Sequence, residues 1–327
     1  MEYTAFGRTS LWVSTICYGT WQFGGDWGRV ERAQWDAGKA TVRQALDMGI
    51  NFFDTAQAYG FGLAERMLGE ALRLYLKSQR DTIVIATKGG LRQEGANLLR
   101  DASARWLRQG VEQSLRNLGV DYIDLYQVHW PDPHTPVEET ARALDQLVQE
   151  GKIRYVGVSN YDAEQMRAFE QTRKLDAFQP PYSLFRREIE RDILPYCQAH
   201  GIGVLVYGAL AHGLLAGRYT PRTTFPADDW RSHNPIFHGD TFARNLAVVA
   251  HLKDLAEREG MSVAQLAIAW VLAQPAVDVA IAGARNPQQL EGTAHAADKR
   301  LSRAALEAIE AIMRDAVPIG GPAPEGM

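Results

Sequence analysis

The fold is decided by a short stretch of sequence, residues 51–60, which reads NFFDTAQAYG. Two phenylalanines run into Asp54, and Tyr59 follows five residues later. The apolar run comes after a segment of helical periodicity and predicts a short buried strand. A carboxylate at the end of such a strand is costly unless a cation pairs with it. We therefore expect a cationic partner for Asp54 elsewhere in the chain.

The composition is that of an ordinary globular protein. The chain has 327 residues, of which 46% are hydrophobic and 23% charged, with a net charge of −4. No stripe of Lys and Arg appears, so no nucleic-acid partner is expected. The first residues lack the pattern of a signal peptide and no apolar run reaches membrane-spanning length. Cys17 and Cys197 stand in apolar segments and are expected to be reduced thiols, which indicates a cytoplasmic protein. The lack of a long apolar run indicates no membrane contact.

Short apolar strands alternate with helical segments along the whole chain, and no linker interrupts them. This alternation predicts a parallel sheet with crossover helices, and eight units favour a closed (β/α)₈ TIM barrel over an open sheet. We expect one domain over residues 1–327, with a hairpin at 1–14, extra C-terminal helices and a loosely held tail at 315–327. The predicted strands cover residues 15–18, 49–54, 82–87, 123–128, 153–158, 177–179, 204–207 and 277–281.

Helical periodicity marks the segments between and after these strands. A long insertion with three prolines, residues 208–239, separates the seventh strand from the next helix. The predicted helices cover residues 36–48, 62–76, 103–118, 137–149, 162–172, 187–199, 240–259, 262–273 and 302–314, with one more starting at Asn286-Pro287.

Polar residues stand at or just past the ends of the apolar strands. In a barrel all of these ends lie on one rim, where active sites are built. Residues far apart in the sequence should therefore meet at one mouth. They are Asp54, Tyr59, Lys88, His129, Ser159, Asn160, Gln179, Tyr207 and Arg285.

The chemistry of one half of this set suits proton donation. Lys88 is the cation expected beside Asp54. An ammonium about 4 Å from the Tyr59 hydroxyl would stabilise its phenolate by roughly 4 kcal/mol at an effective dielectric near 20, and would lower the pKa of that phenol from ~10, while desolvation opposes this. His129 can donate a hydrogen bond to a carbonyl oxygen. Together these groups form a proton-donating pocket for an oxygen that gains negative charge.

The other half of the set suits a hydride carrier, which would complete the reduction of a carbonyl. Ser159, Asn160 and Gln179 offer hydroxyl and amide groups that can pair with a nicotinamide carboxamide. Tyr207 offers a flat face on which the ring can stack. The rim therefore predicts a nicotinamide-dependent carbonyl reductase.

The motifs resemble those of the aldo-keto reductases, most closely the bacterial branch that is similar to potassium-channel β subunits. The resemblance covers nearly all of the chain. Any one motif would be weak, but their order and spacing together are highly specific. They are FDTAQAYG at residues 53–60, TK at 87–88, VHWP at 128–131 and GVSN at 157–160.

The resemblance implies an NAD(P)H-dependent enzyme that reduces an aldehyde or ketone to an alcohol. It implies that Tyr59 is the general acid, that Lys88 lowers its pKa, that Asp54 pairs with Lys88 and that His129 orients the carbonyl. For the cofactor it implies three groups of residues. Ser159, Asn160 and Gln179 would hold the carboxamide, with Tyr207 stacked on the ring. The segment from Gly208 and Leu210 to Gly217 and Arg218 would wrap the pyrophosphate. Arg285 and Gln289 would meet the adenosine 2′-phosphate, and Gly283 is also expected to bind the cofactor.

The nucleotide end is supported by the residues themselves. Asn286-Pro287 reads as the cap and first residue of a helix, and a helix N-terminus beside an arginine is a good phosphate site. This favours NADPH as the cofactor. NADH stays an alternative, because four places depart from the family pattern. These are Ala64, Gly208-Ala209, Ala282 and Thr293.

The substrate itself is not specified, beyond a small carbonyl compound. Trp27 and Trp130 are expected as pocket walls, while Trp230 in the insertion reads equally as part of a lid or as packing. A metal site at His129, Asp132 and His134 is not expected, because their spacing suits no ligand pattern.

Two other functions remain open. A nucleotide-binding regulatory subunit resembling channel β subunits is the main alternative. The intact set of Asp54, Tyr59, Lys88 and His129, and the short stretch before the first barrel strand, favour the enzyme. A Schiff-base lyase or isomerase using Lys88 is disfavoured, since such a lysine must shed its proton and Asp54 opposes that.

Overall fold

Eight parallel strands close into a barrel in the computed structural model, which describes residues 1–24, 31–95 and 97–320. Neighbours around the barrel follow the order of the chain, and the last strand pairs with the first. The predicted (β/α)₈ TIM barrel is therefore confirmed. Its strands are β3 (Ile16–Gly19), β4 (Phe52–Asp54), β5 (Val84–Gly89), β8 (Ile123–Val128), β9 (Ile153–Ser159), β10 (Ala177–Gln179), β11 (Gly203–Val206) and β12 (Val279–Gly283).

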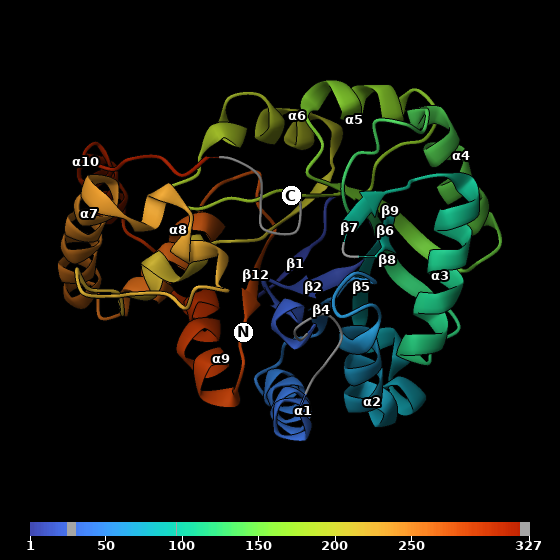
Figure 1. The fold of residues 1–327 in the computed structure, drawn as a ribbon, viewed down its shortest axis with the longest axis horizontal. Coiled ribbons are helices and arrows are strands. Elements are labelled where there is room, and N and C mark those ends of the chain that lie inside the picture. The colour runs from blue at the N-terminus through green and yellow to red at the C-terminus, as the bar shows by residue number, and fades with distance from the viewer. Residues whose placement is uncertain (25–30, 96, 321–327) are drawn as a thin grey trace.

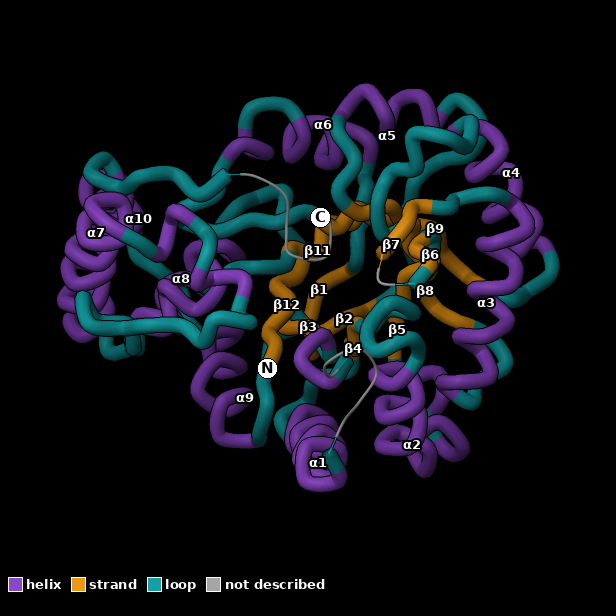
Figure 2. Tube along the Cα trace, in the orientation of Figure 1, coloured by secondary structure: helices purple, strands orange, loops and turns teal. Residues whose placement is uncertain are grey.

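Helices surround the barrel as an outer ring (Figure 1). The helices α7 and α10 pack together on one side of the ring, and α10 follows the last barrel strand, where extra C-terminal helices were predicted. Figure 2 shows the strands gathered inside the helices. The helices are α1 (Arg32–Asp47), α2 (Leu63–Ser78), α3 (Ala104–Leu118), α4 (Val137–Gln149), α5 (Ala163–Glu170), α6 (Ile193–His200), α7 (Gly239–Arg258), α8 (Val263–Leu272), α9 (Pro287–Ala294) and α10 (Arg303–Met313).

One helix starts later than the sequence pattern indicates. The helix expected over 187–199 begins only at Ile193, after a separate 3₁₀ turn at Glu188–Glu190. Pro195 explains the shift. A proline has no N–H and fits only the first turn of a helix, and a start at Ile193 places Pro195 in that turn.

Two antiparallel hairpins are added to the barrel. The predicted N-terminal hairpin consists of β1 (Tyr3–Ala5) and β2 (Trp12–Ser14). It closes the bottom of the barrel, because Phe6 packs edge-on against the inward-facing Phe52 with ring centroids 5.6 Å apart. The second hairpin, β6 (Leu91–Glu94) and β7 (Asn97–Arg100), was not predicted and follows β5 at the opposite, C-terminal rim.

The bottom of the barrel repeats one contact four times. At the start of every second barrel strand, a side-chain oxygen of Asn or Asp accepts a backbone N–H. The donor lies in the preceding barrel strand in three cases, and two residues before that strand in the fourth, Ser14. We call these four residues the Asx latches. They are Asn51 to Ser14 N at 2.7 Å, Asp124 to Ile85 N at 3.0 Å, Asp176 to Val156 N at 3.0 Å and Asp278 to Val204 N at 2.9 Å.

Each latch fixes which side chains point into the barrel. Side chains alternate along a strand, so the first and third residues after a latch face inward. The first residues are Phe52, Leu125, Ala177 and Val279, which share one apolar cluster inside the barrel. The third residues form a layer above them, as expected for alternate strands of such a barrel. This top layer consists of Asp54, Gln127, Gln179 and Ile281.

The start of the predicted tail is held against the body. Asn245 binds both backbone groups of Val317, donating to its carbonyl at 3.1 Å and accepting its N–H at 2.8 Å. Ile319 is buried and its N–H donates to the carbonyl of Phe185. Residues 321–327 lie outside the described part. Within the described residues, none of the helices combines the length and apolar character needed to cross a bilayer.

We predict that the latch Asp278 makes stability depend on pH. Burial raises the pKa of its carboxyl to about 6, although hydrogen bonds from the backbone N–H groups of Val204 and Gly7 act to lower this pKa. The folded state therefore holds the proton more tightly than the unfolded state, so the stabilisation by protonated Asp278 is lost as pH rises from about 4 to about 6. Asp278→Asn cannot titrate. The free energy of unfolding of the wild type minus that of the variant should fall by on the order of 2 kcal/mol across this range.

Urea unfolding of both proteins at pH 4.5, 5.5 and 7.0 measures this difference. Every other titrating group is common to the two proteins, so its contribution cancels. Parallel pH profiles would show that Asp278 titrates alike in the folded and unfolded chains.

Candidate active site

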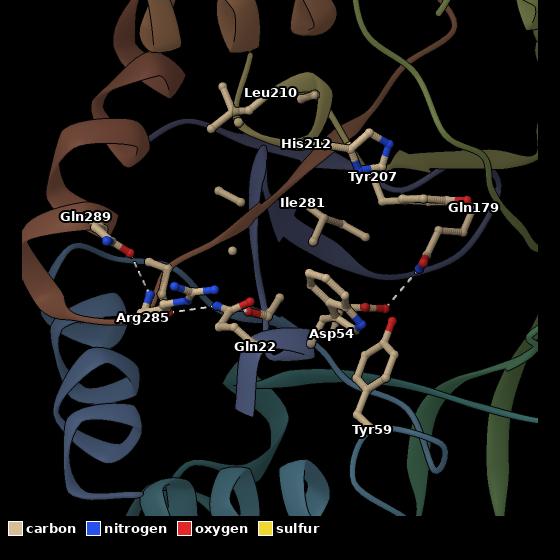
Figure 3. A pocket seen from close by; sticks show the side chains of 18 of the residues that line it. Gln22, Asp54, Tyr59, Gln179, Tyr207, Leu210, His212, Ile281, Arg285 and Gln289 are labelled. Carbon is tan, nitrogen blue, oxygen red and sulfur yellow. Dashed lines mark hydrogen bonds between the residues drawn. The ribbon is translucent and has the colours of Figure 1, made fainter. Parts of the chain in front are cut away.

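A cavity of about 530 Å³ opens at the C-terminal rim of the barrel. Most of the side chains predicted to meet there do line it, as Figure 3 shows for those it labels. They come from the ends of six different strands, from the insertion and from α9. The predicted residues that line the cavity are Asp54, Tyr59, His129, Ser159, Asn160, Gln179, Tyr207, Gly208, Leu210, Trp230, Gly283, Arg285 and Gln289.

Lys88 lies directly behind this lining and is 1% exposed. Its ammonium donates to Asp54 Oδ1 at 2.6 Å, to the carbonyl of Thr55 at 2.9 Å and to the Tyr59 hydroxyl at 3.3 Å. An ammonium has three N–H donors, so all three are used. The expected cationic partner of Asp54 is therefore present. Since the phenol oxygen accepts from Lys88, the phenol proton points elsewhere.

The backbone after β4 carries Tyr59 to this position. Thr55 donates its N–H to the carbonyl of Ala86, and Gln57 donates to that of Lys88, both at 2.9 Å, so the chain stays paired with β5 beyond the strand end. A turn then brings Tyr59 back over Lys88. Gly60 has a φ of +60°, and a Cβ there would lie 2.1 Å from the carbonyl oxygen of Gly24. Only glycine fits this turn.

His129 faces the same phenol from β8. The two rings meet edge to face with centroids 5.7 Å apart. Burial, with the Lys88 charge as a second cause, holds the pKa of His129 well below its usual value. Its Nδ1 is buried and has no hydrogen-bond partner among the described residues. The imidazole is therefore neutral at neutral pH, with one N–H to donate.

The amide-bearing residues form a connected network. Gln179 Nε2 donates to Asp54 Oδ2 at 2.9 Å, and Ser159 Oγ donates to the carbonyl of Gln179 at 2.8 Å. Asn160 donates to the carbonyl of His129 at 2.9 Å and accepts from the Tyr207 hydroxyl at 2.8 Å. Asn160 has a φ of +63°, a conformation that asparagine tolerates better than most residues.

The far end of the cavity is shaped as a helix N-terminus. Asn286 Oδ1 accepts the N–H of Gln289 at 3.0 Å and caps α9, with Pro287 as its first residue. The backbone N–H of Arg285 donates to Gln289 Oε1 at 2.9 Å (Figure 3). This leaves the exposed guanidinium of Arg285 beside the positive end of the helix, an arrangement that suits a phosphate.

Four other residues that were predicted to bind cofactor or substrate are not among the described residues that line the cavity. Trp130 is buried behind the rim, with the guanidinium of Arg100 5.1 Å from its ring centroid. Gly217 and Arg218 follow a 3₁₀ segment, Ala211–Ala216, and are not among the described residues that line the cavity. Trp27 lies outside the described residues.

The insertion contributes a predicted lining residue, Trp230, and others that the sequence did not reveal. Trp230 both lines the cavity and packs, with its ring centroid 4.8 Å from that of His212 and 5.7 Å from that of Phe237. His212 has a φ of +56°, and burial, followed by the charges of Arg186 and Arg231, lowers its pKa to about 4. The further lining residues that were not predicted include Gly19, Trp21, Gln22, His212, Asp228, Asp229, Arg231 and Ile281.

Gln127 was also missed, although it belongs to the top layer. It stands within β8, two residues before His129, and the predictions considered mainly residues at or past strand ends. Alternation from the inward-facing Leu125 is the signal that would have found it. Among the described residues, no group of three His, Cys, Asp or Glu side chains is arranged to hold a metal ion.

Comparisons with known proteins agree with this geometry. The family model "Aldo/keto reductase family" matches residues 15–314. The chain is 43% identical to "Aldo-keto reductase YhdN" of Bacillus subtilis, covering 98% of this chain and 96% of that protein. It is 34% identical to "NADH-specific methylglyoxal reductase" of Escherichia coli, covering 95% and 100%. It is also 34% identical to "Probable voltage-gated potassium channel subunit beta" of Oryza sativa, covering 96% and 97%.

A solved structure gives the same result in three dimensions. The glycerol dehydrogenase AKR11B4 from Gluconobacter oxydans superposes with a TM-score of 0.90 at 41% identity, and the match covers 98% of each chain. The sequence similarity and the shared barrel both extend over nearly the whole chain. The protein belongs to the aldo/keto reductase family.

Proposed function

We propose that the protein reduces an aldehyde or ketone to an alcohol with NAD(P)H, and that Tyr59 is the general acid. Family membership makes it an oxidoreductase of carbonyl chemistry in general. The observation that carries the finer proposal is the set of contacts of Lys88. Its ammonium lies between the Asp54 carboxylate at 2.6 Å and the Tyr59 hydroxyl at 3.3 Å, at the wall of the cavity.

Proton transfer follows from these contacts. Tyr59 gives its proton to the carbonyl oxygen, and the phenolate left behind is stabilised by the adjacent Lys88 ammonium. Asp54 pairs with the Lys88 ammonium and holds it in place. The neutral His129 donates its N–H to the same carbonyl oxygen and so orients the substrate. In the opposite direction the Tyr59 phenolate takes a proton from an alcohol, so the same residues serve both directions.

The residues present fit a nicotinamide cofactor. Among the described residues, none donates to Gln179 Oε1, which is thus left as an acceptor for a carboxamide, and Tyr207 beside it offers a ring face. When bound, the cofactor supplies the hydride that the carbonyl carbon takes up. Arg285 and the N-terminus of α9 would hold the 2′-phosphate of NADPH. The Escherichia coli relative is named as NADH-specific, which supports a nicotinamide cofactor without deciding between the two forms.

A regulatory role is the second candidate, and the similarity to plant channel β subunits supports it. The ordered contacts of Lys88, Tyr59 and His129 support the enzyme instead, because a purely regulatory nucleotide site has no need of a proton donor. Oxidation of NADPH and NADH, followed across a panel of aldehydes, ketones and sugars, separates the two. Tight nucleotide binding without turnover of any carbonyl would favour regulation.

We predict that Tyr59→Phe lowers kcat for carbonyl reduction by at least about 100-fold, the usual contribution of a general acid. The ring remains and only the proton donor is lost, so the Kd for NADPH should change less than about twofold. Steady-state kinetics and a fluorescence titration measure the two quantities. Tyr161→Phe is the control, because Tyr161 is equally buried near the rim but lies outside the cavity lining described above. Near wild-type kcat in Tyr59→Phe, with cofactor still bound, would exclude this mechanism.

We predict that Arg285→Ala weakens NADPH binding by about tenfold or more and leaves NADH binding within about twofold. Hydrogen bonds to charged groups are worth roughly 1.5–3 kcal/mol, and only NADPH carries the phosphate that would receive them. Titration of each cofactor against each protein gives the Kd values. Arg222→Ala is the control, because Arg222 is an exposed arginine of the insertion and is not among the described lining residues; it should change neither Kd. Equal weakening of both cofactors would place Arg285 elsewhere than at the 2′-phosphate.

A further inference from the structure

The top layer of the barrel contains a polar residue that the proposed mechanism does not use. Gln127 is completely buried, between Lys88 on one neighbouring strand and Gly157 on the other. Its Oε1 accepts from Gln179 Nε2 at 3.4 Å. Its own Nε2 is buried and has no hydrogen-bond partner among the described residues. An unsatisfied buried N–H destabilises a protein, so its presence calls for a reason.

The reason lies in the amide of Gln179. The NH₂ group of that amide donates to Asp54 Oδ2 at 2.9 Å (Figure 3) and to Gln127 Oε1 at 3.4 Å, so both of its N–H bonds are already used. The reverse orientation would bring the amide oxygen against the Asp54 carboxylate and the oxygen of Gln127, where like partial charges repel. Two acceptors fix the plane of the amide, where one would leave it free to rotate.

The surrounding backbone leaves space for this arrangement. A Cβ at Gly157 would lie 3.0 Å from the Cγ of Gln127, closer than side chains normally approach. Because Gly157 has no side chain, Gln127 has room to extend toward Gln179. Exchanging the oxygen and the NH₂ group of the Gln127 amide would place two NH₂ groups, those of Gln127 and Gln179, against each other. The NH₂ group of Gln127 would again have no acceptor in the described part of the chain. The NH₂ group of Gln127 therefore lacks a partner among the described residues because its Oε1 is the atom that faces the NH₂ group of Gln179.

We infer that Gln127 is a positioning residue that holds Gln179 as a hydrogen-bond acceptor, so that this site selects a ring substituent able to donate an N–H. The inference rests on the proposed function, in which Gln179 meets the nicotinamide carboxamide. It adds a residue below the cavity that determines which substituent is accepted. A cofactor whose carboxamide is replaced by an acetyl group has no N–H for Gln179 to accept and should bind less well.

The test compares two probes, NADP⁺ and its 3-acetylpyridine analogue, each titrated by quenching of tryptophan fluorescence. In the wild type the Kd of the analogue should exceed that of NADP⁺ about tenfold. Gln127→Leu removes the second acceptor, and this ratio should fall about fivefold while the melting temperature stays near that of the wild type. Gln127→Glu keeps an oxygen at the same reach and should restore most of the ratio.

Two further variants keep the result unambiguous. Gln127→Met removes the acceptor with a side chain of similar length and replaces Gln127→Leu if that variant does not fold. Tyr126→Phe is the matched control on the same strand. It deletes a buried hydroxyl on the outer face of β8, which has no hydrogen-bond partner among the described residues, and should leave the ratio unchanged.

Each outcome bears on a different claim. Failure of the wild type to bind NADP⁺, NADPH and NADH would overturn the proposed function and this inference with it. Binding with equal Kd values for the two probes in the wild type, or an unchanged ratio in both Gln127→Leu and Gln127→Met, would overturn the inference alone. A loss of stability without a change in the ratio would make Gln127 a packing residue.

Discussion

The rim depends on one buried ion pair, Lys88 with Asp54. Removing two charges from water is unfavourable, and the attraction between them offsets this only when their remaining hydrogen-bonding capacity is also satisfied. Here it is satisfied on both sides, because the ammonium has three acceptors and the second carboxylate oxygen accepts from Gln179. The Tyr59 hydroxyl is one of those acceptors. The group proposed to move a proton is thus also a structural partner of the pair, which ties its position to the stability of the barrel.

The two ends of the barrel are built on different principles. The bottom is closed by apolar contacts of the N-terminal hairpin and by the Asx latches, which bond backbone to side chain and involve no group of the cavity. The top is a network of side chains that bond to one another and to three backbone carbonyls. Because the same strands connect both ends, a latch at the bottom sets the level at which a side chain appears at the top. On these four strands, the position of the residue in the top layer is therefore fixed from three residues below it.

Much of this architecture could be predicted from the sequence, and the failures have physical causes. The eight strands were found because both faces of a parallel strand are buried, which leaves uninterrupted apolar runs. Asp54 stood out because a charge ends such a run. The hairpin at residues 91–100 was missed because its exposed strands carry Arg, Gln and Glu and show little apolar pattern. His212 and Asp228 lie in an insertion without periodicity, so nothing in the chain indicated that they reach the cavity. Nor did the sequence reveal the fourfold repeat, since one latch is Asn and the residues after it differ in every unit.

The top layer has one member without polar chemistry. Ile281 occupies the fourth place, at the level of Asp54, Gln127 and Gln179, and its side chain lines the cavity. Its strand is secured below by Asp278, and the Ile281 side chain also packs against the apolar cluster inside the barrel. The fourth position of the top layer therefore carries no polar group. A polar side chain at this place would add a fourth functional group to the floor of the cavity, at the level of the other three, in exchange for the apolar contact that Ile281 makes below.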